Sequence, residues 1–110
     1  MRKMYVIGPV SGIKDDNRPA FEAAARALHD AYGCEVEIPH DTIPAGTEWD
    51  DAMHKSLSRL ATADAVAMLD GWASSRGACI EFQVADLLRH YGLMQARTVK
   101  AWLDDAPKVA

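Results

Sequence analysis

The sequence predicts a single-domain α/β fold, a three-layer sandwich in which a four-stranded parallel sheet of order 2-1-3-4 carries helices on both faces, as in Rossmann-like and flavodoxin-like proteins. Short β-rich segments alternate with helical segments in the pattern β-α-β-α-β-α-β. Residues 64–69 are apolar on both alternating faces, as in a covered central strand, whereas residues 34–38 and 98–103 alternate as edge strands do. The length of 110 residues fits one domain, predicted to span residues 1–110.

The chain opens with a strand followed by a helix. Residues 3–7 are rich in β-formers and end at a loop bounded by glycines, residues 8–12. Residues 15–17 offer N-caps for a helix that has Pro19 in its first turn and stops at Gly33. The apolar residues that recur at helical spacing, and form its predicted buried face, are Phe21, Ala24, Ala25, Leu28 and Tyr32.

A second strand and a second helix follow. Residues 34–38 alternate apolar and charged residues, so one face is expected to be solvated, and Pro39 ends the strand. Residues 40–47 form a loop rich in Pro, Gly and Thr. Residues 48–61 are predicted to be a helix, with Trp49 as a packing residue. The inward residues of this helix are expected to be Met53, Leu57 and Leu60.

The remaining elements are the central strand, a long helix and a second edge strand. The helix follows residues 64–69, runs to about His90 and ends at Gly92. Its predicted apolar stripe is Ile80, Val84, Leu87, Leu88 and Tyr91. The last strand is predicted at residues 98–103, with Trp102 as a packing residue, and residues 104–110 form a frayed tail.

Composition limits the classes of partner. The formal net charge of −4 argues against a nucleic-acid polymer or an anionic membrane as the partner, although a local site for one phosphate needs only a few donors. No segment approaches the roughly 20 apolar residues of a membrane span, and the apolar part of the N-terminus is too short for a secretory signal. We therefore expect a cytoplasmic protein.

The cysteines and histidines show no pattern typical of a metal site. Cys34 opens a predicted strand and Cys79 lies in a helix elsewhere, so we expect two free, mostly buried thiols, as in a reducing compartment. Neither cysteine has a metal-ligand spacing with the four histidines. No bound metal is expected.

Two polar loops follow the first and third strands, at residues 8–12 and 70–77. In the order 2-1-3-4 the topological switch lies between these strands, and ligands bind beyond the carboxyl ends of strands at such a crevice. Backbone amides from Ser75 to Gly77 open the next helix and can hold an anion, and Glu81 lies about one turn further on. The side chains expected around this pocket are Tyr5, Ser11, Asp70, Ser75, Arg76 and Glu81.

Several short motifs occur in order along the chain. They are Tyr5-Val-Ile-Gly-Pro9, Asn17 and Phe21 at a helix start, Ala63-Asp64 at a strand start, and Ser75 followed six residues later by Glu81. Together these motifs resemble the nucleoside 2-deoxyribosyltransferase superfamily over roughly residues 3–103. Residues 71–81 are most similar to its small phage and bacterial members, which carry Gly-Trp-x-x-Ser-Arg-Gly-Ala-x-x-Glu.

The resemblance implies an N-glycosidase or deoxyribosyltransferase that cleaves the base–sugar bond of a (deoxy)nucleoside 5′-monophosphate. In that family the glutamate matching Glu81 attacks C1′ and forms a covalent glycosyl–enzyme intermediate, and the tyrosine matching Tyr5 orients it. Members that hydrolyse 5′-monophosphates carry a serine at the position of Ser75. The other residues expected to contact the ligand are Gly8, Ser11, Gly12, Trp72, Arg76 and Gly77. The resemblance also implies no cofactor, and a homodimer or larger assembly whose pocket is completed by a second chain.

One position departs from the family pattern. The catalytic aspartate expected eight positions before Asp64 is Ser56 in this chain, and a serine does not protonate a leaving base as a carboxylic acid does. The candidates to replace it are Asp70, Asp51 and His54. If none of them acts, the alternative is a non-catalytic nucleotide-binding protein that senses or sequesters its ligand. A scaffold role in an assembly is the third possibility.

Each candidate residue also has a purely structural interpretation. In it, Glu81 is a solvated carboxylate near a helix start, Ser75 is an N-cap, and Arg76 is a surface charge or part of an intersubunit ion pair. Asp70 then caps its own loop, and Trp72 covers that loop against a neighbouring subunit instead of stacking on a base.

Overall fold

Four parallel strands form the central sheet in the order β2-β1-β3-β4, as predicted. They are β1 (Lys3–Ile7), β2 (Glu35–Glu37), β3 (Ala65–Met68) and β4 (Gln95–Thr98). A computed structural model of the chain describes residues 1–107. Met4 of β1 pairs with Val36 on one side and with Ala65 on the other, and Ala65 pairs in turn with Gln95. The two central strands are therefore β1 and β3, with the topological switch between them.

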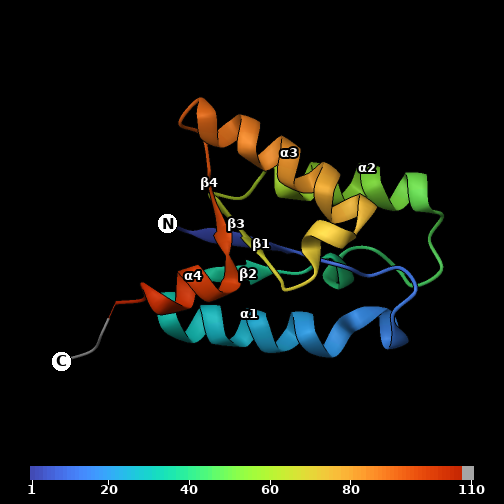
Figure 1. The fold of residues 1–110 in the computed structure, drawn as a ribbon, viewed down its shortest axis with the longest axis horizontal. Helices are drawn as coiled ribbons and strands as arrows, with labels where there is room; N and C mark the ends of the chain where they lie inside the picture. Colours follow the sequence, from blue (N-terminus) through green and yellow to red (C-terminus); the bar gives the residue numbers. More distant parts are fainter. Residues whose placement is uncertain (108–110) are drawn as a thin grey trace.

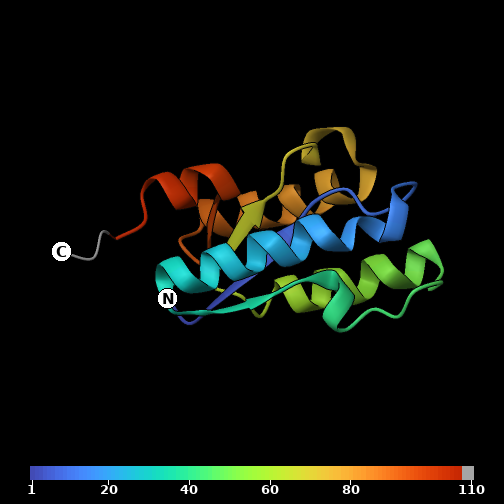
Figure 2. The ribbon, with the colours of Figure 1, turned by 90° about the horizontal axis from the view of Figure 1, so that it is seen from below.

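Helices cover both faces of the sheet, which gives the predicted three layers (Figure 1). The helices are α1 (Arg18–Tyr32), α2 (Trp49–Leu60), α3 (Arg76–His90) and α4 (Val99–Asp104). Helices α1 and α4 lie on one face, and α2 and α3 lie on the other. In the view from below, α1 runs across the sheet (Figure 2).

The alternation of side chains along the strands builds two cores, one on each face of the sheet. On one face, Met4 and Val6 are buried against a set that includes Phe21, Leu28 and Trp102. On the other face, the buried residues are Tyr5, Ile7, Leu60, Ala63, Val66, Met68, Ala85 and Met94. Burying one large apolar side chain contributes about 1.5–3 kcal/mol, so both cores stabilise the sheet that positions its loops.

The ends of β1 and β3 approach closely where the two loops leave the sheet. A Cβ atom added at Gly8 would lie 2.8 Å from Cβ of Leu69, so only glycine fits there without a backbone shift. Asn17 Nδ2 donates a hydrogen bond to the Pro9 carbonyl at 2.9 Å and ties the start of α1 to the same loop. Residues 15–17 all have positive φ angles of 54–57°, a conformation that Asp and Asn tolerate better than most residues.

The predicted strand at residues 98–103 is wrong. The strand is Gln95–Thr98, and the chain turns directly into α4 because the Thr98 side chain accepts a hydrogen bond from the Ala101 amide at 3.0 Å. Trp102 is buried, as predicted, and its Nε1 donates to the Val66 carbonyl at 3.0 Å. In the predicted tail, Asp104 is the last residue of α4, and residues 108–110 lie outside the described part of the chain.

The predicted inward face of α3 is partly wrong. Leu87 and Tyr91 are 59% and 71% exposed, while the buried residues of the helix are Ala78, Glu81 and Ala85. The helix packs closely by its small residues, since a Cβ atom on Gly77 would lie 3.1 Å from Sδ of Met53. The prediction of the buried face relied on the spacing of large apolar residues. This spacing does not reveal a helix face that packs through alanine and glycine.

The expected solvated face of residues 34–38 is also wrong in part. Glu35 is exposed, but Glu37 is buried, because Lys3 and Arg59 approach its carboxylate at 2.8 and 2.6 Å. The hydrogen bond from Arg59 lowers the pKa of Glu37 most, against the effect of its burial, and the hydrogen bond and the charge of Lys3 lower it further.

Two further features agree with expectation. The thiols of Cys34 and Cys79 are free, with Cys34 buried and Cys79 half-buried. Among residues 1–107, no helix combines the length and the apolar character needed to cross a membrane.

Candidate active site

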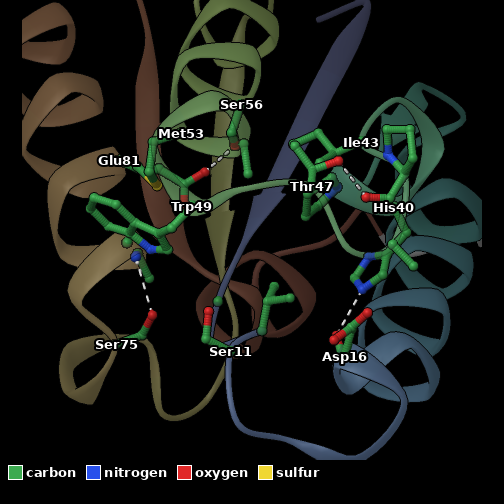
Figure 3. A pocket seen from close by; sticks show the side chains of 18 of the residues that line it. Ser11, Asp16, His40, Ile43, Thr47, Trp49, Met53, Ser56, Ser75 and Glu81 are labelled. Carbon is green, nitrogen blue, oxygen red and sulfur yellow. Dashed lines mark hydrogen bonds between the residues drawn. The ribbon is translucent and has the colours of Figure 1, made fainter.

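A cavity of about 280 Å³ opens at the edge of the sheet where the strands have their carboxyl ends (Figure 3). Its walls come from the β1–α1 loop, the β2–α2 segment, one side of α2 and the first turns of α3. Of the residues predicted from the sequence, Gly8, Ser11, Ser75, Gly77 and Glu81 line it. The switch-point crevice between β1 and β3 is therefore the location of the cavity, as the strand order predicts.

Glu81 reaches the cavity from α3 although its side chain is buried, with 6% of the residue exposed. Ser56 Oγ on α2 donates a hydrogen bond to Oε2 of Glu81 (Figure 3). The hydroxyl of Tyr5, on β1, lies 2.8 Å from the same Ser56 Oγ. Three buried polar side chains from three separate elements thus form one hydrogen-bonded chain that ends at the Glu81 carboxylate.

Burial controls the protonation of the side chains in this hydrogen-bonded chain. Removal from water raises the pKa of Glu81 to about 7, although the hydrogen bond from Ser56 acts in the opposite direction. Burial also raises the pKa of Tyr5 above its ordinary value, so its phenol keeps its proton. When Glu81 is ionised it only accepts hydrogen bonds, so Tyr5 donates to Ser56 and Ser56 donates to Glu81.

The start of α3 supplies polar groups on the same side of the cavity. Ser75 is the N-cap, and its Oγ accepts a hydrogen bond from the Ala78 amide at 3.2 Å. Ser11 from the β1–α1 loop and the backbone of Gly77 line the cavity close by. The first turn of a helix with unpaired amides favours an anion, which fits the predicted role of Ser75 and Gly77 beside the capping role.

Arg76 stacks on Trp49 instead of entering the cavity. Its guanidinium carbon lies 4.2 Å from the centre of the Trp49 ring, and Arg76 borders an adjoining depression that it shares with Ser74 and Gly71. Trp49 itself, predicted to be a packing residue, lines the main cavity at the first position of α2. The Arg76 contact fixes the orientation of this aromatic wall.

The wall opposite Glu81 comes from the segment after β2, which the sequence reasoning did not assign to the site. His40, Ile43 and Thr47 lie there, with Asp16 beside them (Figure 3). Arg18 lines the cavity as well. His40 Nε2 lies 2.7 Å from the Asp16 carbonyl oxygen, and its Nδ1 is buried without a hydrogen-bond partner. The available signal was topological, since β2 is parallel to β1 and its following loop must emerge at the same edge of the sheet.

Several predicted residues lie outside the cavity. Asp70 is exposed, and neither it nor Gly12 lines the cavity. Trp72 also lies outside, because its ring packs against Phe82 with 4.6 Å between the ring centres. The prediction that one pocket gathers all six polar side chains is therefore wrong for Asp70 and for Arg76, neither of which lines this cavity. Tyr5 contributes only through the hydrogen bond with Ser56.

The other candidates for a general acid do not line the cavity either. Asp51 and His54 are exposed residues of α2. The residue of this helix that contacts Glu81 is Ser56, whose hydroxyl is not an acid near neutral pH. The proposed role of Asp51 and His54 as acids stays a prediction without geometric support. Within residues 1–107, no group of three or more His, Cys, Asp or Glu side chains has the arrangement of a metal site.

The chain matches the model of a family described as a domain of unknown function (DUF4406). The match covers residues 2–91, which run from the residue before β1 to the residue after α3. The matched region contains Tyr5, Ser56 and Glu81. No curated protein matches the chain.

Proposed function

This chain belongs to the DUF4406 family of domains of unknown function, and we propose that it is an N-glycosidase or deoxyribosyltransferase-type enzyme acting on a (deoxy)nucleoside 5′-monophosphate. The single observation that carries the proposal is Glu81, a buried carboxylate that borders a cavity and is held by the Ser56 hydroxyl. A carboxylate in such a position can capture the oxocarbenium-like C1′ of a sugar.

The reaction proceeds in two displacements at C1′. In the first, a Glu81 oxygen bonds to C1′ while the C1′–N bond breaks and its electron pair leaves with the base. In the second, water or another base attacks C1′ and the electron pair of the ester bond returns to Glu81. The attacking group loses a proton to solvent, which balances the proton that the departed base takes up from solvent. Tyr5 and Ser56 act as positioning residues, because their hydrogen bonds fix the carboxylate while it reacts.

The polar groups around Ser75 support a 5′-phosphate as the other end of the ligand. Ser11, Ser75 and the start of α3 present donors to the cavity, and Arg18 lines it as well. The volume of about 280 Å³ lies just below the range of ordinary ligand sites, which run from about 300 to 1,000 Å³. A mononucleotide fits this size better than a dinucleotide does.

Incubation with a panel of ribo- and deoxyribonucleoside 5′-monophosphates, with chromatographic detection of free base, tests the proposal. We expect base release from at least one nucleotide, and loss of that release in Glu81→Ala. Asp30→Ala, at an exposed position near the end of α1, is the control and should keep the activity. Base release no faster than that of Glu81→Ala across the panel would overturn the proposal.

A second function, non-catalytic nucleotide binding, is favoured by one observation. Ser56 occupies the place where the resembling family has its acid, and its hydroxyl contacts both Tyr5 and Glu81. A protein of this kind would sense or sequester a nucleotide. Thermal stabilisation by a nucleotide that is recovered unchanged after prolonged incubation would support this function over the enzymatic one.

We also propose that the chain acts in the cytoplasm as a homo-oligomer. Leu87, Tyr91 and Leu93 are 59%, 71% and 69% exposed at the end of α3 and in the turn that follows it. Exposed large apolar side chains that gather in one region are typical of an interface. Sedimentation of the wild type and of Leu87→Glu/Leu93→Glu should show a larger species only for the wild type.

A further inference from the structure

We infer that the base recognised by this site is guanine, and that the Asp16 carboxylate accepts hydrogen bonds from its N1–H and 2-amino groups. The inference rests on the proposed function and deepens it by naming the base of the substrate. It is supported by the position of Asp16 across the cavity from Glu81, by its free carboxylate and by the contacts that hold its backbone.

The direction of attack decides where the base lies. Glu81 displaces the base in the first step, so the C1′–N bond points away from the attacking oxygen. The base of a bound nucleotide therefore lies against the wall across the cavity from Glu81. The residues of this wall that Figure 3 labels are Asp16, His40, Ile43 and Thr47.

The side chains of His40 and Thr47 have no proton to offer a ligand. His40 Nε2 lies 2.7 Å from the Asp16 carbonyl oxygen and Nδ1 is buried, so neither ring nitrogen is open to the cavity, whatever the protonation state of the ring. The Thr47 hydroxyl donates to the Pro44 carbonyl at 2.6 Å, which leaves only its lone pairs for a ligand.

The Asp16 carboxylate is free to bind a ligand. The residue is exposed, and among residues 1–107 its side chain takes part in none of the hydrogen bonds or ion pairs. Arg18, which also lines the cavity, forms its ion pair with Glu22 at 3.6 Å. An ionised carboxylate only accepts hydrogen bonds, and its two oxygens lie side by side, so it pairs best with two adjacent N–H groups.

Guanine is the common base whose edge matches such an acceptor. Its N1–H and 2-amino groups are adjacent donors that reach both oxygens of one carboxylate. Adenine and cytosine present one amino group beside a ring nitrogen that accepts, and thymine and uracil present one N–H between two carbonyl groups. Each of these four bases would place an acceptor against a carboxylate oxygen. Enzymes that bind a single unstacked base identify it by hydrogen bonds to this edge.

The backbone at Asp16 is fixed in an unusual conformation. Residues 15–17 have φ angles of 54–57°, and such angles in residues other than glycine persist where surrounding contacts enforce them, often at ligand sites. The Asp16 amide donates to the Ile13 carbonyl at 3.0 Å, and its own carbonyl is held by His40. The His40 ring packs in turn edge-on against Phe21, with 4.8 Å between the ring centres. Asp16 therefore enters the complex already positioned.

Three purine nucleotides that differ only at C2 of the base test the inference. They are the 5′-monophosphates of guanosine, with an amino group there, of inosine, with hydrogen, and of xanthosine, with a carbonyl oxygen (GMP, IMP and XMP), each also as the 2′-deoxy compound. We expect kcat/KM for base release to be at least about 10-fold higher for GMP than for IMP or XMP, as hydrogen bonds to a base edge typically discriminate. Equilibrium titration with the same nucleotides should give the same order of Kd.

Asp16→Asn is the informative variant, because asparagine keeps the shape of the side chain and tolerates a positive φ. Its amide presents one acceptor and one donor, which match the N1–H and the C2 carbonyl of xanthine, so the preference should change from GMP to XMP. Asp15→Asn is the matched control, because Asp15 has a φ of 56° and is exposed but does not line the cavity. This control should keep the preference for GMP.

The outcomes separate this inference from the proposed function. Equal values for GMP and IMP, or a loss in Asp16→Asn that is the same for all three nucleotides, would overturn guanine recognition and leave the proposed glycosidase standing. If no nucleotide releases base above the Glu81→Ala background, the proposed enzyme is overturned and the Kd values decide alone. Tighter binding of GMP that Asp16→Asn reverses would then support the inference, and binding without preference, or no binding, would overturn it.

Discussion

Ser56 of α2 donates a hydrogen bond to Glu81 of α3, and both side chains are almost fully buried. The carboxylate is thus kept at the edge of the cavity by a neutral partner and not by a cation. Such a partner orients the charge without fully compensating its removal from water. The predictions below follow from this arrangement and from the close packing around it.

The first prediction concerns stability and pH. The pKa of Glu81 is raised from 4.5 to about 7, so the folded state binds this proton more tightly than the unfolded state does. The stabilisation that comes from this tighter proton binding is fully present below pH 4.5 and is lost as the pH rises through 7. The total loss of unfolding free energy is up to about 3 kcal/mol. Glu81→Gln removes the ionisation, so urea denaturation should show the variant to be more stable than the wild type at pH 8 and nearly equal to it at pH 5.

Asp30→Asn provides the comparison for that experiment, because Asp30 is an exposed carboxylate on α1. Its effect should be small and similar at both pH values. A gap between wild type and Glu81→Gln that stays constant from pH 5 to pH 8 would contradict the account of Glu81.

The second prediction concerns the pH dependence of activity. A nucleophilic Glu81 must be ionised, so kcat/KM for base release should rise with pH and reach half of its plateau near pH 7. The other titratable group on this hydrogen-bonded chain is Tyr5, whose raised pKa keeps it neutral throughout this range. Initial rates measured from pH 5 to pH 9 check the profile, and a plateau already reached at pH 5 would show that the reacting group is an ordinary exposed carboxylate.

The third prediction separates the role of Ser56 in positioning the Glu81 carboxylate from its role in the stability of the fold. In Ser56→Ala, Glu81 loses the hydrogen bond that favours its ionised form, so the midpoint of the pH–rate profile should move upward. The Tyr5 hydroxyl loses its partner as well, which should cost about 1–3 kcal/mol of unfolding free energy. The double variant Tyr5→Phe/Ser56→Ala should lose less unfolding free energy than the two single variants lose together, because both substitutions remove the same contact.

The fourth prediction compares two glycines beside the cavity. Gly8→Ala places Cβ 2.8 Å from Cβ of Leu69, an atom next to the backbone, so it should destabilise by about 1–3 kcal/mol. Gly77→Ala meets Sδ of Met53 at 3.1 Å, the far end of a flexible side chain, and should cost clearly less. Thermal unfolding of the two variants ranks them, and an equal or reversed order would show that the β1–β3 approach is not the tighter contact.

The sheet was predictable because a strand that is buried on both faces appears in the sequence as a continuous run of apolar residues. Residues 64–69 are apolar at every position but the first, and this pattern alone places them at the centre of the sheet. Residues 98–103 misled for the same reason: Val99, Ala101 and Leu103 alternate as in a strand, while the cap at Thr98 starts a short helix. Local hydropathy does not distinguish these two outcomes over six residues.

The site was predictable only as far as its loops follow from the strand order. Ser11, Ser75 and Glu81 lie near the carboxyl ends of β1 and β3, and the cavity is there. The contact between Ser56 and Tyr5 has no local signal, because the two residues are 51 positions apart and meet only through packing of α2 on the sheet. His40 has none either, since its segment carries no hydropathy period.

The origin of the hydrogen-bonded chain in β1, α2 and α3 has a consequence during protein synthesis. A nascent chain that has emerged from the ribosome as far as residue 75 contains Tyr5 and Ser56, but it still lacks Glu81 and the helix that removes it from water. In the extended polypeptide that glutamate titrates like any other. The raised pKa of Glu81 is therefore acquired only late in translation. It appears when α3 docks on a sheet whose first three strands have already been synthesised.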